Sequence, residues 1–145
     1  MATKTLFYAV IAAAGLAGCA TPGPSPEQSK KSLTCSDLAK ECKVTVTVGN
    51  CPILQCLSVD YDLVLITDKN KITITWLLSN QGDYAFADPD GIKFDQSGSD
   101  FKCKADGKWK YACTNDNSRV AAYKYTVNVK GLLPIPPLDP WIVNN

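Results

Sequence analysis

Apolar and polar residues alternate with a period of two along most of the chain after residue 42. Val44, Val46 and Val48 are separated by threonines, and the same alternation returns in several later segments. Because successive side chains of a β-strand point to opposite faces, this period is typical of strands with one buried face. The pattern predicts strands at 44–48, 59–66, 72–78, 84–87, 91–94, 101–104, 108–113 and 123–129.

The segments between these strands are short and carry turn residues. Asp106-Gly107 is a strong hairpin signal, because a type I′ turn needs two residues that tolerate positive φ. Helical periodicity is missing from the strand region, and the one helical turn that we predict lies within 32–42, with Ser36 as its N-cap. Seven or eight short strands at close spacing predict an all-β domain, either a sandwich or a small barrel.

The C-terminal segment 133–140 is rich in proline, which cannot donate the hydrogen bonds of a β-ladder. We expect it to run extended along an edge or over the surface. Trp141 and the two apolar residues after it then dock as a closing segment, because a bare terminal tryptophan would be costly.

The first eighteen residues have the organisation of a secretory signal. Lys4 supplies a positive charge, an apolar run covers 6–16, and small residues follow up to Cys19. The run is shorter than the roughly 20 apolar residues that a transmembrane helix needs, so we expect export rather than a permanent span.

Leu16, Ala17, Gly18 and Cys19 resemble, position by position, the lipobox of bacterial lipoproteins. The resemblance implies that Cys19 is linked to diacylglycerol, becomes the N-terminus after cleavage and is acylated with a fatty acid such as palmitate. Ala20 occupies the position where the inner-membrane retention signal of that family has Asp, which favours the outer membrane. The alternative is an ordinary signal peptide followed by a chance cysteine.

The sequence therefore predicts three parts: a signal peptide at 1–18, a lipidated tether at 19–33 and one β domain at 34–145. The tether is rich in proline, serine and charge and has no apolar periodicity. Cleavage removes one of 15 basic residues and none of 14 acidic ones, so the mature chain is neutral. Neutrality removes the usual electrostatic argument for a nucleic-acid partner, and the membrane is expected to be contacted through the lipid on Cys19.

Six of the seven cysteines lie beyond the lipobox, and an even number in an oxidising compartment predicts up to three disulfides. We expect Cys103 to bond Cys113 because the predicted hairpin brings them together. The other local pairs that we predict are Cys35 with Cys42 and Cys51 with Cys56. A metal site is disfavoured, since the chain has no histidine and no C-x-x-C pair, and no cofactor is expected.

Tyr123 and Tyr125 resemble the Y-x-Y start of the penultimate strand in immunoglobulin-like and cupredoxin-like domains, and Trp76 resembles their buried central tryptophan. The resemblance implies a Greek-key β-sandwich of seven to eight strands over 44–129, here stabilised by disulfides. It concerns fold alone. Tyr125 stands where antibody-type domains have the second cysteine of their inter-sheet disulfide, and without histidine the copper site of cupredoxins is excluded.

The lack of histidine also excludes Ser-His-Asp and Cys-His catalysis and the usual zinc hydrolases. Carboxylate chemistry remains, with Asp60 and Asp62 expected on one strand face and an acidic loop that could hold calcium. That loop contains Asp88, Asp90, Asp95 and Asp100. Turn and surface roles account for the same residues, and the calcium-loop pattern of EF-hands is not completed, so we expect no enzyme activity.

The predicted hairpin around Asp106-Gly107 mixes basic and aromatic side chains. The candidate ligand-binding residues are Lys108, Trp109, Lys110 and Tyr111. Simple alternation favours Trp109 and Tyr111 facing inward, with the lysines in solvent protecting an edge strand from pairing. If Trp109 is exposed instead, this hairpin is the best candidate site for a protein or glycan ligand.

We therefore expect a lipoprotein at the outer membrane that acts as a non-catalytic binding or accessory module of the cell envelope. One alternative is a structural subunit of an envelope or secretion assembly, which would present an uncovered edge strand or an apolar patch. A second is a carboxylate-dependent, glycan-acting enzyme, which would present two acidic residues across a pocket.

Overall fold

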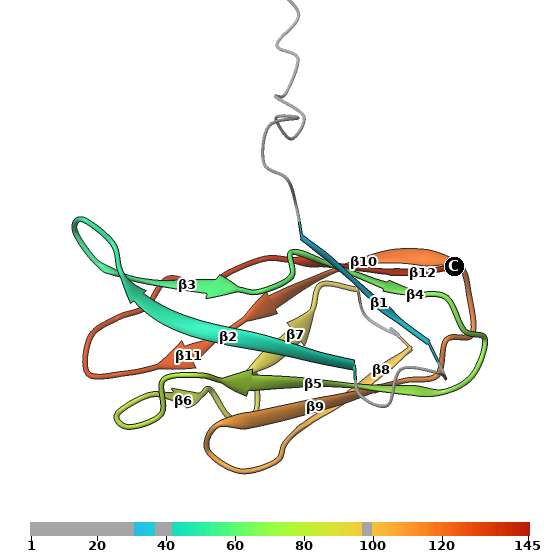
Figure 1. Ribbon diagram of the computed structural model, residues 1–145. Coiled ribbons are helices and arrows are strands. Elements are labelled where there is room, and N and C mark those ends of the chain that lie inside the picture. Colours follow the sequence, from blue (N-terminus) through green and yellow to red (C-terminus); the bar gives the residue numbers. More distant parts are fainter. Residues whose placement is uncertain (1–30, 37–41, 97–99) are drawn as a thin grey trace, which may run out of the picture.

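The computed structural model describes residues 31–36, 42–96 and 100–145, which form a β-sandwich without helices (Figure 1). The first sheet contains, in spatial order, β1 (Ser32–Cys35), β4 (Leu63–Ile66), β12 (Trp141–Asn144), β10 (Ala121–Val127) and β7 (Ile92–Phe94). The second sheet contains β3 (Gln55–Val59), β2 (Cys42–Asn50), β5 (Ile72–Leu78), β9 (Lys110–Asn115) and β8 (Phe101–Ala105). A short ribbon pairs β6 (Ala85–Phe86) with β11 (Val129–Lys130).

The all-β sandwich predicted from the sequence is confirmed, with more strands than the seven or eight expected. Each of the eight predicted segments forms strand structure. Two of them are divided, because 59–66 contributes to β3 and β4 and 123–129 contributes to β10 and β11. The strands β1 and β12 complete the twelve that the described residues form.

The division of 59–66 corrects the prediction that Asp60 and Asp62 share a strand face. Both lie in the connection from β3 to β4, where the chain crosses from the second sheet to the first. The Asp60 carboxylate accepts a hydrogen bond of 2.8 Å from the Thr45 amide, and the Asp60 amide donates to the Thr45 carbonyl. These two bonds lie at the end of the β2–β3 pairing. After them the chain crosses to the other sheet.

The helical turn predicted within 32–42 would begin after its N-cap Ser36, so the residues that would form it lie outside the described ones, and the residues before Ser36 form a strand. Ser32–Cys35 forms β1, which pairs in parallel with β4 from Ser32 opposite Leu63 to Cys35 opposite Ile66. Ser36 follows β1 directly, and 37–41 lies outside the described residues. The strand begins two residues before the predicted domain boundary at 34.

The apolar residues of the alternating sequence pattern fill the space between the two sheets. Val44, Val46 and Val48 of β2 point inward and are buried, as are Tyr123 and Tyr125 of β10. The largest fully buried side chains are aromatic, namely Trp76, Tyr111, Tyr123 and Tyr125. Trp76 lies on β5, the middle strand of the second sheet, as its resemblance to a central-strand tryptophan implied.

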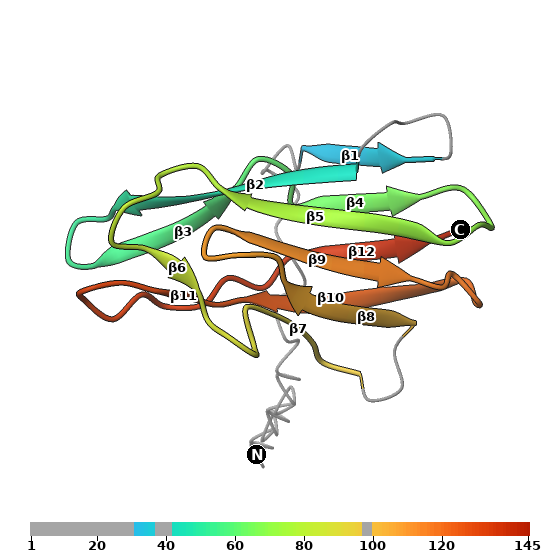
Figure 2. The same cartoon turned by 90° about the horizontal axis from the view of Figure 1, so that it is seen from below.

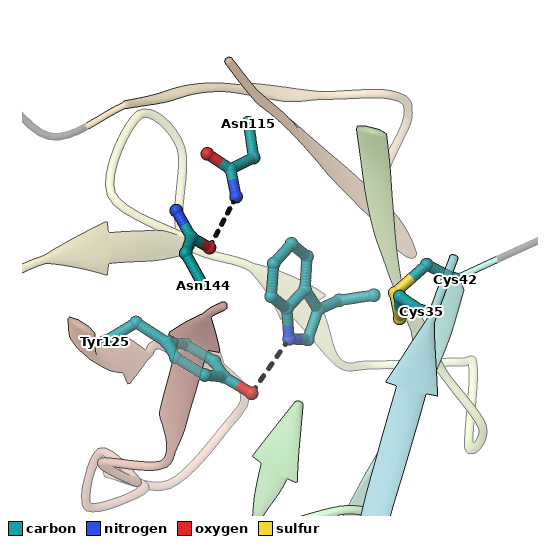
Figure 3. Close-up of a disulfide and its surroundings, with 6 residues drawn as sticks. Cys35, Cys42, Asn115, Tyr125 and Asn144 are labelled. Atoms are coloured by element: carbon teal, nitrogen blue, oxygen red, sulfur yellow. Dashed lines mark hydrogen bonds between the residues drawn. A yellow bond between two sulfur atoms is a disulfide. The ribbon is translucent and has the colours of Figure 1, made fainter. Parts of the chain in front are cut away.

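All three predicted disulfides are present: Cys35–Cys42, Cys51–Cys56 and Cys103–Cys113. Cys103 and Cys113 lie directly opposite each other in the β8–β9 hairpin. Cys35–Cys42 is different, because it joins β1 of the first sheet to β2 of the second and is buried (Figure 3). The fold thus has an inter-sheet disulfide, at another place than in antibody domains.

The C-terminal segment forms an interior strand of the first sheet. β12 lies between β4, to which it is parallel, and β10, to which it is antiparallel. The proline-rich approach is extended, and Leu138 bridges to Val127 of β10. In this register Ile142 and Asn144 point into the core, whereas Trp141 faces solvent, so the docking prediction holds for the segment and is wrong for the tryptophan side chain.

Candidate binding surface

Four connections come together at one end of the sandwich, which we call the loop end. They are the β2–β3 loop (51–54), the β5–β6 loop (79–84), the β8–β9 turn (106–109) and the start of the β11–β12 connection (131–137). Both views of the molecule place them on the same side, away from the C-terminus (Figures 1 and 2). Loop clusters on a rigid β scaffold are a common place for binding residues.

Tyr84, in the β5–β6 loop, contacts residues in or next to the other three connections. Its hydroxyl oxygen accepts a hydrogen bond of 2.6 Å from the Gln55 side-chain amide, and its carbonyl oxygen accepts one of 3.1 Å from the Trp109 indole. Its ring lies against the backbone of Gly131, where an added Cβ would approach ring carbons to 2.9 Å. The side chain and the backbone carbonyl of Tyr84 together therefore connect these loops. The sequence indicated 84–87 only as a strand and gave no sign of this role.

The hairpin residues Lys108 and Trp109 lie at the surface of the loop end. The Trp109 side chain is 36% exposed, with one edge held by the Tyr84 carbonyl. The Lys108 ammonium lies 5.4 Å from the Trp109 ring centroid and donates a hydrogen bond of 2.6 Å to the Gly82 carbonyl. A cation placed over an indole face is a favourable contact that also orders both side chains. The inward orientation favoured for Trp109 by alternation is therefore wrong.

The other two candidate hairpin residues have different positions. Tyr111 is buried, its hydroxyl donates to the Pro89 carbonyl, and burial raises the pKa of its phenol. It belongs to the core and cannot contact a ligand directly, which corrects its place among the candidate residues. Lys110 points to solvent and forms an ion pair of 2.7 Å with Asp106 across the turn. Of the four candidate residues, only Lys108 and Trp109 are both exposed and in contact with each other.

Aliphatic side chains project from two of the loops at this end. The exposed fractions are 91% for Ile53, 55% for Leu54, 85% for Leu132 and 60% for Leu133. Neither 48–59 nor 131–138 contains a charged residue. We did not single out these residues from the sequence, although each aliphatic pair lies beside a proline in a turn-forming segment, a pattern that disfavours burial in a strand.

The acidic residues of the predicted calcium loop are dispersed. Asp100 accepts hydrogen bonds from the Ser118 hydroxyl at 2.6 Å and the Ser118 amide at 2.9 Å, and the Ser118 hydroxyl is the main cause of the lowered pKa of Asp100. Asp88 and Asp90 flank Pro89 in a turn. Within the ranges that the structure describes, no three His, Cys, Asp or Glu side chains come close enough to hold a metal ion.

A shallow cavity of about 210 Å³ lies at the opposite end of the sandwich, beside the C-terminus. It is lined by Lys69, Asn117, Ser118, Arg119, Val120 and Asn145. A glycosidase needs two carboxyl side chains facing each other across the substrate, and this cavity is lined by none. No observation at this cavity favours the enzymatic alternative.

The signal peptide, Cys19 and most of the tether lie outside the described residues. Within the described part of the chain, no helix is long and apolar enough to cross a membrane. The chain matches no protein-family model and no curated protein.

Proposed function

We propose that this chain is a lipoprotein anchored at the outer membrane through Cys19, whose β-sandwich is a non-catalytic binding module that uses the loop end. The lipobox-like residues before Cys19 support the anchor. The observation that carries the binding role is the group of exposed apolar side chains on loops fixed by Tyr84.

Exposed aliphatic residues are ordinary when they occur singly, but several on neighbouring loops mark an interaction surface. Here they are also held in place before any partner arrives. Cys51–Cys56 closes the first loop, and prolines restrict the second. Binding by ordered residues loses little conformational entropy, so such a surface suits recognition.

A second candidate role is that of a structural subunit, and β3 favours it. This strand forms one edge of the second sheet and contains no charged residue and no proline. The opposite edge, β8, carries Lys102 and Lys104, which discourage pairing with another strand. An unprotected edge can accept a strand from a neighbouring protein.

The anchor is tested by labelling producing cells with a palmitate analogue and separating their membranes. We expect the label on the wild-type chain in the outer-membrane fraction and its loss in Cys19→Ser. An unlabelled wild-type chain recovered in the soluble fraction would refute the anchor and leave the loop end to be tested separately.

The binding role is tested by placing a photo-crosslinking amino acid at position 132 in living cells. Position 120 is the matched control, because Val120 is also exposed, at 78%, but follows β9 near the opposite end. We expect adducts with protein, glycan or lipid from position 132 and few from position 120. Equal or absent labelling at both positions would contradict a binding role for the loop end.

A further inference from the structure

We infer that the loop end docks on the surface of the lipid bilayer, with the tips of the β2–β3 and β11–β12 loops inserted among the acyl chains. This inference rests on the proposed function, because the lipid on Cys19 would keep the domain beside a membrane. It names the partner of the loop end as a lipid surface rather than a protein or a glycan.

The chemistry of the tips favours lipid. The most exposed large apolar side chains of the loop end are isoleucine and leucine, and the segments that carry them, 48–59 and 131–138, have no charge that insertion would have to desolvate. Protein-binding hot spots are instead enriched in Trp, Tyr and Arg, with leucine under-represented. Interfacial membrane anchors gain their free energy from the apolar area that they bury.

The tips are also rigid enough to insert as they are. In the first loop the Cys51 amide donates a hydrogen bond of 2.9 Å to the Leu54 carbonyl, inside the ring closed by Cys51–Cys56. In the second loop Gly131 lies under the Tyr84 ring and Ile135 lies close to the same glycine. Because Tyr84 is also bonded to Gln55, next to the first loop, the two tips are held as one unit.

The residues around the loop tips have the polarity expected of side chains at the level of the lipid headgroups. Trp109 has an apolar ring and a polar edge, the combination found at membrane interfaces. Lys108, over the Trp109 ring, and Lys130, at the end of β11, are exposed at the same end and can meet anionic headgroups. The exposed carboxylates of Asp83 and Asp106 are also at this end and limit insertion to the two loop tips.

The length of chain before the first described residue is compatible with this orientation. Eleven residues lie between Cys19 and Lys31, and an extended chain spans at most about 3.5 Å per residue, so the anchor can lie up to roughly 40 Å from the domain. That reach allows the loop end to meet the bilayer while the lipid stays inserted.

The test uses the mature chain, 19–145, with Cys19→Ser, so that binding reports the protein and not its lipid. Co-sedimentation is measured with vesicles of about three parts phosphatidylethanolamine to one part phosphatidylglycerol. We expect binding that falls about tenfold or more in Leu132→Gln/Leu133→Gln, because both leucines lose the free energy of apolar transfer. Val120→Gln, an equally exposed substitution away from the loop end, should bind as the parent does.

Most of the binding should also survive about 0.5 M salt, since apolar insertion is not screened. Binding that the double variant leaves unchanged, or no binding to the vesicles at all, would overturn the inference. The proposed function would survive either result if position 132 still crosslinks to a protein or glycan in cells. Conversely, if the wild-type chain in cells carries no lipid at Cys19 while the vesicle binding is observed as expected, loop insertion is supported and the anchor is refuted.

Discussion

Trp76 and Tyr125 join the two sheets through the middle of the core. The Trp76 indole nitrogen donates a hydrogen bond to the Tyr125 hydroxyl oxygen at 3.3 Å, and the two rings meet edge to face with centroids 5.4 Å apart (Figure 3). Trp76 belongs to β5 of the second sheet and Tyr125 to β10 of the first. Burial raises the pKa of the Tyr125 phenol, which therefore stays protonated well above neutral pH.

Tyr125→Phe should lower the free energy of unfolding while keeping the ring contact. Because the Trp76 N–H would be left buried without its acceptor, we expect a loss of about 1–3 kcal/mol. Urea denaturation followed by tryptophan fluorescence measures the change. Tyr61→Phe, a partly exposed tyrosine between β3 and β4, is the control, and an equal loss in both variants would contradict a special role for the pair.

Asp100 should make stability depend on acid pH. Its pKa is lowered in the folded state, chiefly by the Ser118 hydroxyl, so the folded chain binds its proton less readily than the unfolded chain. The stabilisation is present above about pH 4, the usual pKa of Asp, and is lost as pH falls through the lowered value. Asp100→Asn should cost about 1–2 kcal/mol at pH 7.

The same comparison at about pH 2.5 should give a smaller difference between the two chains, since the wild-type carboxyl gains its proton as pH falls toward and through its lowered pKa. Urea denaturation at both pH values measures it. A deficit of Asp100→Asn that is constant from pH 7 to 2.5 would show that packing, rather than the charge, is responsible.

The three disulfides should contribute unequally although their loops are similar in length. Replacing Cys35 and Cys42 by alanine removes a buried link between the sheets, and we expect a loss near the upper end of the usual range of about 2–5 kcal/mol. Replacing Cys51 and Cys56 by serine affects an exposed loop and should cost less. Thermal unfolding of both double variants ranks them, and the reverse order would contradict this assignment.

Gly91 and Gly49 form a matched pair for testing how closely the core is packed. A Cβ added at Gly91 would lie 2.7 Å from the Tyr111 ring and 2.9 Å from the Phe86 Cβ, whereas one at Gly49 would meet only the Cys56 sulfur at 3.8 Å. Gly91→Ala should therefore destabilise the protein by about 1–3 kcal/mol through overpacking. Gly49→Ala should be close to neutral, and equal effects on the unfolding midpoint would argue against the close contact at Gly91.

Much of the β-sandwich was predictable because its signals are local. Alternation placed Val44, Val46 and Val48 on the inner face of β2, and it did the same for Tyr123 and Tyr125 in β10. The disulfides were also predictable, since each joins cysteines that are close in sequence. The strand β1 was not predicted, because it depends on pairing with β4, a distant part of the chain.

The loop end depended on tertiary structure. Ile53 and Leu132 are far apart in sequence, and nothing local indicates that their loops lie at the same end or that Tyr84 connects them. By itself, the sequence determined the strand periodicity and the local disulfides, and the export signal at 1–18 stays a prediction. Only the tertiary structure decided which apolar residues stay exposed, because burial depends on which strands become neighbours, and strand pairing across a sandwich is a long-range property.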